Sequence, residues 1–183
     1  MFEYNHEVYT LTHALTPIHH GQPHATEPQR VSFTLTPEDP TADAALESPT
    51  RLIYAVILDR EVFYIGEARS SLLTRLRRGF AAYRRYLRNG HALNGYKGYK
   101  WIPRLIEDNN LEIEVHAFIF GADFDPDERR CEIEAVEGDM AYLVRTTNGK
   151  WPTYQNEIHF GNHAGAPETA KQIIKDMGEK IGW

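Results

Sequence analysis

Hydrophobic residues form short continuous runs in the middle of the chain, a pattern typical of strands that are buried on both faces. Residues 52–58 are one such run, and a second apolar run follows the pair Asp59-Arg60. The two runs and the turn between them predict a β-hairpin over residues 52–66. Residues 111–120 alternate between polar and apolar positions and then become apolar, which predicts a third strand.

Three stretches instead have the 3.6-residue spacing of apolar positions that is typical of amphipathic helices. They cover approximately residues 70–89, 126–147 and 167–180. The first of them contains Gly79, and we expect the helix to be interrupted or bent there because glycine is a poor helix former.

The second helix has the clearest boundary signals in the chain. Asp125 stands at the capping position, Pro126 suits the first turn, and Glu128 completes a capping box. Asn148-Gly149 predicts the end of the helix, since glycine readily adopts the left-handed conformation that follows a last helical turn.

Residues 1–50 differ in composition from the rest of the chain. They hold five of the nine histidines together with many Pro and Thr residues. Segments 7–15 and 31–36 are each compatible with a short strand, and segment 37–50 has the composition of an acidic loop or linker. The histidine spacings match no standard metal site, so we interpret this region as an N-terminal extension or arm.

These elements predict an α+β fold. We expect a small, central, mainly antiparallel three-stranded sheet, flanked by helices and preceded by the N-terminal extension. At 183 residues the chain has the size of one domain with an added segment. The expected organisation is an extension over 1–50, a central domain over 51–160, and a C-terminal helix over 161–183 that packs on that domain.

Composition excludes several classes of protein. Cys131 is the only cysteine, so an internal disulfide and a cysteine-based zinc site are ruled out. The first residues lack the basic start and apolar run of a secretion signal, and no apolar stretch approaches membrane-spanning length. We therefore expect a cytoplasmic protein that does not enter a membrane.

The distribution of charge is more informative than its total. The chain has a formal net charge of −6, yet segment 69–106 contains ten Lys or Arg residues and no Asp or Glu. Phosphate affinity depends on the local patch and the counterions it releases, so this segment favours a polyanionic partner. The alternative is a solvated basic surface that balances acidic neighbours.

Five of these cations fall on one side of the helix predicted over 70–89, while Arg75 lies on the opposite flank near its amino end. That separate position suits an individual task for Arg75. The candidate phosphate-binding residues are Arg69, Arg77, Arg78, Arg84, Arg85, Arg88, Lys97 and Lys100.

Aromatic residues alternate with lysines between Gly90 and Trp101. Side chains in this arrangement can stack on bases or sugars while the lysines neutralise phosphates. The alternative is that Tyr99 and Trp101 anchor the loop on the core.

Glu137 stands out on the helix predicted over 126–147. It falls within the apolar stripe, between Ile133 and Met140. A carboxylate on a core-facing stripe is costly unless it is paired or bound to a metal. The alternatives are that Glu137 marks the end of the stripe or pairs with a buried arginine.

Together these residues resemble the GIY-YIG nucleases over about residues 51–160. Leu52-Ile53-Tyr54 resembles the first element of that family, with Leu52 in place of its glycine, and Tyr64-Ile65-Gly66 is the complete second element after nine intervening residues. Arg75 and Glu137 stand where the family carries its arginine and its metal-binding glutamate. Segment 151–156 resembles the Pro-to-Asn element that ends the family's domain. Many members of the family carry a His or Tyr four residues after the arginine, and this chain has Gly79 at that position.

The resemblance implies a metal-dependent endonuclease that hydrolyses phosphodiester bonds of DNA, with site-specific, restriction-type cleavage as in small stand-alone members. Glu137 would hold Mg²⁺ or Mn²⁺, and Arg75 would bind the scissile phosphate. Tyr54 would orient or deprotonate the attacking water, Tyr64 would hydrogen-bond the water or phosphate, and Asn156 would brace the site. Double-stranded DNA is the expected partner, and palindromic cutting would suggest a homodimer.

Two other functions fit parts of the sequence. A catalytically inactive nucleic-acid-binding module of the same fold is favoured by the departures at Gly79 and Leu52. A small protein-interaction domain would instead use the basic face to meet an acidic partner.

Overall fold

The computed structural model describes residues 1–17, 29–47, 49–91, 96–107, 113–155 and 158–183. The strands are β1 (Tyr4–Pro17), β2 (Gln29–Pro37), β3 (Arg51–Leu58), β4 (Glu61–Arg69) and β5 (Ile113–Phe120). The helices are α1 (Ala44–Glu47), α2 (Leu72–Asn89), α3 (Ile102–Glu107), α4 (Arg130–Asn148) and α5 (Ala166–Ile181), with short 3₁₀ helices η2 (Ala122–Phe124) and η3 (Asp127–Arg129). Within the described residues, no helix is long and apolar enough to cross a membrane.

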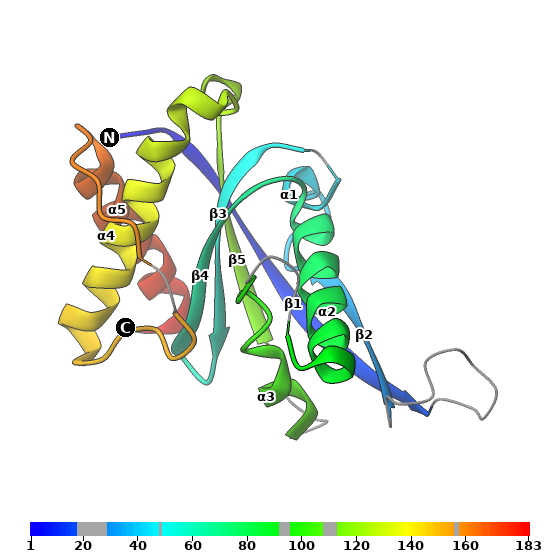
Figure 1. Cartoon of the computed structure of the whole chain (residues 1–183). Helices are drawn as coiled ribbons and strands as arrows, with labels where there is room; N and C mark the ends of the chain where they lie inside the picture. The colour runs from blue at the N-terminus through cyan, green and yellow to red at the C-terminus, as the bar shows by residue number, and fades with distance from the viewer. Residues whose placement is uncertain (18–28, 48, 92–95, 108–112, 156–157) are drawn as a thin grey trace.

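The strands form one antiparallel sheet in the order β2-β1-β5-β3-β4 (Figure 1). The predicted α+β class, with an antiparallel sheet and flanking helices, is confirmed. The predicted number of three strands is wrong, because β1 pairs along β5 and carries β2 on its other edge. The sequence signal for residues 7–15 and 31–36 showed that each could be a strand, but not that both would extend the central sheet.

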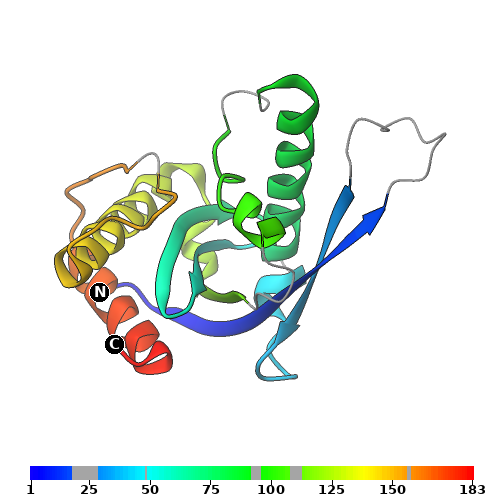
Figure 2. The same ribbon diagram turned by 90° about the horizontal axis from the view of Figure 1, so that it is seen from below.

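Two layers of helices cover the two faces of the sheet, with α1, α2 and α3 on one face and α4 and α5 on the other (Figures 1 and 2). Side chains alternate between the faces along each strand, so the sheet separates two hydrophobic clusters. Strand β4 is the last strand of the sheet, and its outer edge lies between the two helical layers. This edge is where the candidate site forms.

The predicted hairpin is confirmed, and its register is set by the turn together with a β-bulge. Asp59 and Arg60 both have positive φ, 50° and 66°, as a two-residue turn between twisted strands requires. The turn pairs Leu58 with Glu61, and a register shift between Val56 and Ile57 then places Tyr54 opposite Gly66. Strand β4 continues past Gly66 to Arg69, which is longer than the sequence predicted.

Helix α2 is unbroken through Gly79, so the predicted interruption is wrong. Gly79 is buried, and a Cβ on residue 79 would lie at an ordinary contact distance, 3.6 Å, from the carbonyl oxygen of Gly98, so the surrounding packing supports the helix through this position. Ser71 caps the helix, its hydroxyl oxygen accepting the backbone N–H of Thr74 at 3.3 Å.

The predicted capping box of the next helix is also wrong. The Asp125 carboxylate accepts the backbone N–H of Arg51 at 2.9 Å, so it ties the chain to β3 instead of capping a helix. Helix α4 begins only at Arg130, after η3, and has no side-chain cap. Its predicted end is confirmed, because Gly149 adopts the left-handed conformation with φ 75°.

Candidate active site

Two tyrosine rings lie together on the face of the sheet that α2 covers. The centroids of Tyr54 and Tyr64 are 5.8 Å apart, across the β3–β4 pair. Gly66 makes the room for both, since a Cβ at this position would lie 2.7 Å from Cε1 of Tyr64 and 3.0 Å from Cε1 of Tyr54. The two tyrosine rings can therefore lie side by side only because residue 66 has no side chain.

Arg75 extends from the first turns of α2 to this tyrosine pair. Its Nε–H donates to the hydroxyl oxygen of Tyr54 at 3.3 Å, and its guanidinium carbon lies 4.9 Å from the ring centroid of Tyr96. Tyr54 and then Tyr96 raise the pKa of Arg75 further above its ordinary value, so the group remains charged. Tyr54 itself is only 1% exposed, beneath Arg75.

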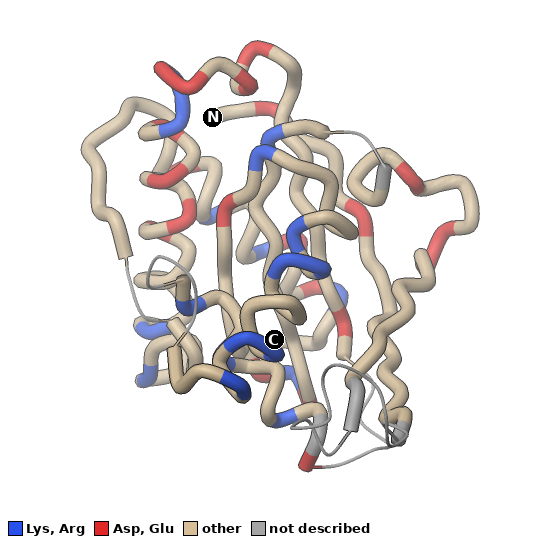
Figure 3. The backbone as a smooth tube through the Cα atoms, turned by 45° about the vertical axis from the view of Figure 1, so that its right-hand side comes forward, with Lys and Arg blue, Asp and Glu red and all other residues tan. Residues whose placement is uncertain are grey.

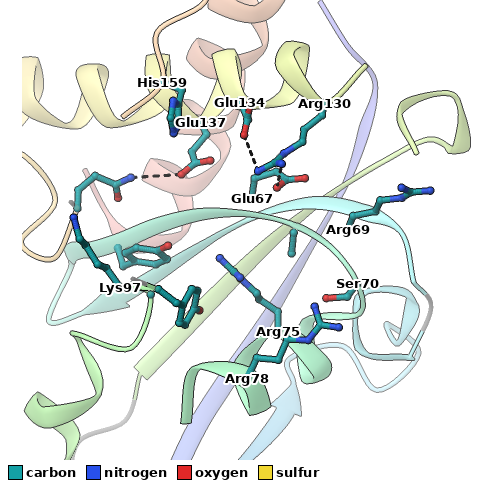
Figure 4. A pocket seen from close by; sticks show the side chains of 15 residues that line it. Glu67, Arg69, Ser70, Arg75, Arg78, Lys97, Arg130, Glu134, Glu137 and His159 are labelled. Atoms are coloured by element: carbon teal, nitrogen blue, oxygen red, sulfur yellow. Dashed lines mark hydrogen bonds and ion pairs between the residues drawn. The ribbon is translucent and has the colours of Figure 1, made fainter. Parts of the chain in front are cut away.

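Glu137 reaches the same place from the other helical layer. It projects from α4 at the edge of β4, and Figure 4 shows it across the pocket from Arg75. The amide Nε2 of Gln155 donates to Glu137 Oε1 at 3.5 Å, while the Oε1 of Gln155 accepts the backbone N–H of Ile65 at 3.1 Å. Gln155 thereby links the carboxylate to β4.

Two further carboxylates lie near Glu137, and both are paired with arginines. Glu67 on β4 forms an ion pair with the buried Arg51 and a longer one, 3.8 Å, with Arg130. Glu134 pairs with Arg130 at 2.9 Å. By contrast, no cation among the described residues lies within ion-pair distance of Glu137.

The absence of a paired cation among the described residues affects the pKa of Glu137. Burial, and next the negative charge of Glu67, raise the pKa of Glu137 to about 8. Glu134 acts in the same direction, while the positive charge of Arg75 acts in the opposite one. The site therefore holds a carboxylate whose negative charge needs an additional cation to be stable at neutral pH.

Between these residues is an open pocket of about 600 Å³ at the edge of β4. Figure 4 shows Arg75 and Arg78 of α2 on one side, and Glu134 and Glu137 of α4 on the other. Five cations line the pocket, which suits it to a phosphate group. They are Arg69, Arg75, Arg78, Lys97 and Arg130.

The residues fit a divalent metal of the magnesium type. Among the described residues, no group of three or more His, Cys, Asp or Glu side chains is arranged around one metal position. Mg²⁺ usually keeps several waters and binds through one or two carboxylates plus substrate phosphate, so Glu137 alone meets the requirement. The raised pKa of Glu137 shows that its ionised form is unfavourable in this site, and a bound metal cation would stabilise that form.

This geometry predicts that the metal-free protein loses stability as pH rises, and that a bound metal ion offsets this loss. Because the pKa of Glu137 in the folded protein is raised above its unfolded value, the folded state binds the proton more tightly and metal-free stability falls as pH rises from about 4.5 to about 8. Adding Mg²⁺ should raise Tm, and more so at pH 8 than at pH 6, where the proton competes with the metal.

Calorimetry from pH 5 to pH 9, with EDTA and with Mg²⁺, measures both effects. The matched control is Glu137→Gln, which keeps an oxygen acceptor for the Gln155 amide but has no proton to release. We expect this variant to exceed the wild type in Tm at pH 8 without metal and to gain nothing from Mg²⁺. An equal response of the two proteins to pH and metal would contradict the assignment.

The predicted phosphate-binding residues divide into two groups. Arg69, Arg78 and Lys97 line the pocket. Arg69 also pairs with Asp127 at 2.7 Å, so it balances the charge of an acidic neighbour as the alternative interpretation of the basic segment expected. Figure 3 shows Lys and Arg positions along α2. Outside the pocket lining, exposed positions are Arg77, Arg88 and Lys100, and partly buried ones are Arg84 and Arg85.

The remaining predicted positions are Asn156 and the aromatic residues between Gly90 and Trp101. Asn156 lies outside the described residues. Trp101 is 1% exposed and donates its indole N–H to the carbonyl oxygen of Gly98 at 3.0 Å, so it anchors the loop, and Tyr99 is likewise buried. Of the aromatics in this loop, Tyr96 lines the pocket.

Sequence reasoning missed Glu67, Gln155, Tyr96 and Arg130 as parts of the site. Glu67 carried a usable signal: it follows Ile65 by two positions on a strand, so it shares the face that packs under α4. That is the same anomaly that identified Glu137. Tyr96 belongs to the alternation of aromatic residues and lysines between Gly90 and Trp101, but that pattern predicted stacking on bases or sugars, not a contact with Arg75. Gln155 and Arg130 had no local signal, because their places depend on how separate elements approach each other.

Comparisons of this chain with protein-family models, with curated proteins and with solved structures found no match.

Proposed function

We propose that this protein is a metal-dependent endonuclease of the GIY-YIG type that hydrolyses phosphodiester bonds of DNA. The observation that carries the proposal is the placement of Arg75 and Glu137 on opposite sides of one pocket, which Tyr64 also lines. The hairpin β3–β4 with β5 would be the three-stranded core of such a nuclease, and β1 and β2 an addition to it.

Hydrolysis requires a water oxygen to bond to phosphorus while the bond from phosphorus to the 3′-oxygen breaks and the water loses a proton. A Mg²⁺ or Mn²⁺ ion held by Glu137 would supply Lewis-acid stabilisation of negative charge at the phosphate and the departing oxygen. Arg75 would bind the scissile phosphate and offset the charge that develops there.

The two tyrosines would have different tasks. Burial raises the pKa of Tyr64 well above its ordinary value, so its hydroxyl keeps its proton and would hydrogen-bond the attacking water or the phosphate. Tyr54 accepts a hydrogen bond from Arg75 and is almost fully buried, which favours orientation of Arg75 over direct removal of a proton from water. The attacking water would then give its proton to solvent, and the departing 3′-oxygen would take a proton from solvent.

Double-stranded DNA is the proposed substrate. Arg78 lines the pocket, and Arg77 and Arg88 are exposed on the same helix, so phosphates flanking the cleaved bond would lie along α2. Restriction-type, site-specific cutting by a homodimer extends the proposal, because a palindromic site presents two equivalent bonds. The single, exposed Cys131 fits a reducing, cytoplasmic setting.

The second candidate is an inactive nucleic-acid-binding module. It is favoured by Gly79, which provides no side chain where active relatives would be expected to carry His or Tyr. Such a module would bind DNA with strong salt dependence but would leave it intact with any metal.

Incubation with a mixed-sequence DNA library and Mg²⁺, followed by deep sequencing of product ends, tests the proposal. We expect ends that require Mg²⁺ or Mn²⁺, disappear with EDTA, and cluster at a shared sequence if cutting is site-specific. Glu137→Gln is the control for a contaminating nuclease. Retention of DNA binding with no metal-dependent ends would support the inactive module instead.

A further inference from the structure

Arg75 has a long side chain that could adopt many rotamers, yet its guanidinium must face the pocket to bind a phosphate. Freezing such a side chain costs conformational entropy, so a group that is already held binds more productively. Two contacts hold it in the structure: the hydrogen bond to Tyr54 and the position 4.9 Å from the ring centroid of Tyr96.

The Tyr96 hydroxyl lies close to two glycines, and its position depends on the first of them. A Cβ on Gly98 would lie 2.3 Å from the Tyr96 hydroxyl oxygen, so only glycine leaves space for it there. A Cβ on Gly79 would lie 3.8 Å from the same oxygen. The Tyr96 hydroxyl therefore stands beside the position on α2 where the sequence lacks a side chain.

Tyr96 also joins the other groups around Arg75. Burial is the main cause that raises the pKa of Tyr96, interaction with Tyr54 adds to it, and the positive charge of Arg75 acts in the opposite direction; the net shift is upward, so the hydroxyl stays neutral. The three residues Tyr54, Arg75 and Tyr96 therefore form one contact group, contributed by β3, α2 and the segment before α3. An aromatic face at this distance attracts a guanidinium, more strongly where water is excluded.

We propose that Tyr96 is a positioning residue that holds the Arg75 guanidinium toward the pocket through its ring face, with its hydroxyl next to Gly79 of α2. This inference rests on the proposed nuclease function for its catalytic consequence, but the positioning itself can be measured without any cleavage.

The first measurement is the Arg75 Nε–H signal in ¹⁵N NMR, assigned by its disappearance in Arg75→Lys. We expect a rigid Nε–H in the wild type and in Tyr96→Phe, which keeps the ring, and a mobile one in Tyr96→Leu. Tyr99→Phe is the matched control, since it removes a hydroxyl from the same segment without touching Arg75.

The second measurement is cleavage kinetics with the binding constant for DNA. Tyr96→Leu should lower kcat by roughly 30-fold, the change that a desolvated cation–π contact represents, with little effect on DNA affinity. Tyr96→Phe should lose at most about 10-fold, the change that one neutral hydrogen bond represents. A general structural defect would instead lower thermal stability and affect binding and kcat together.

The outcomes separate the two proposals. An Arg75 signal that stays rigid in Tyr96→Leu overturns the positioning role, whatever happens to cleavage. A wild-type protein that cuts no DNA while Arg75 loosens in Tyr96→Leu overturns the nuclease and supports the positioning role. A loosened Arg75 with a selective loss of kcat supports both.

Discussion

Replacing Glu137 with alanine is expected to lower Mg²⁺-dependent DNA cleavage by about 10³-fold or more while sparing DNA binding. The reason is that a catalytic metal contributes several kcal/mol of charge stabilisation, and each 1.4 kcal/mol is a tenfold change in rate. Glu137 is the carboxylate of the pocket that has no arginine partner among the described residues, so its removal leaves no replacement ligand in the same place. Initial rates and gel-shift affinities on one DNA substrate measure the two effects separately.

The matched control for this variant is Glu134→Gln. Glu134 lies one turn earlier on α4 and lines the same pocket, but it pairs with Arg130 at 2.9 Å. We expect this control to lose roughly 10- to 100-fold, the range for the loss of an outer-shell partner, and therefore less than Glu137→Ala. If Glu137→Ala cut DNA as fast as the wild type, the metal assignment would be wrong.

The second large effect is expected from Arg75→Ala, which should slow cleavage by roughly 10²-fold or more. Losses of comparable charge stabilisers cost at least this much, because the group acts on charge that develops in the transition state. The structure adds that no second pocket cation has the same pair of tyrosine contacts among the described residues. Single-turnover rates at saturating protein isolate this step from binding.

Two further variants make the Arg75 prediction specific. Arg75→Lys keeps the charge but loses the planar fork, so most of the defect should remain. Arg77→Ala, on the exposed face of α2, should instead weaken binding and reduce the slope of log affinity against log salt by about one, with kcat unchanged. Equal behaviour of Arg75→Ala and Arg77→Ala would show that Arg75 is only one more phosphate contact.

Much of the fold followed from local pattern. The hairpin of β3 and β4, the strand β5 and the helices α2, α4 and α5 were all predicted, because alternation, periodicity and turn residues act over a few positions. The errors were of a different kind. The sequence did not show that β1 and β2 would extend the sheet, or that Asp125 would bind the backbone of Arg51 instead of capping a helix.

Part of the site was predictable: Tyr54 and Tyr64 from their motif spacing, and two charged residues because each violated its local pattern. Glu137 interrupts an apolar stripe, and Arg75 leaves the basic side of its helix, so both could be identified from spacing. Gln155 and Tyr96 obey no such rule. Their roles arise from a hydrogen bond to the backbone of Ile65 and from the space left by Gly98.

The sequence by itself determined the elements, the tyrosine spacing across the hairpin and the unusual polarity of Glu137. Only the tertiary structure decided that α2 and α4, on opposite faces of the sheet, would bring Arg75 and Glu137 to the same open edge of β4. The physical reason is that local propensities act between near neighbours in the chain. The approach of Arg75 and Glu137 depends instead on how two helical layers, formed by distant parts of the sequence, pack on the sheet.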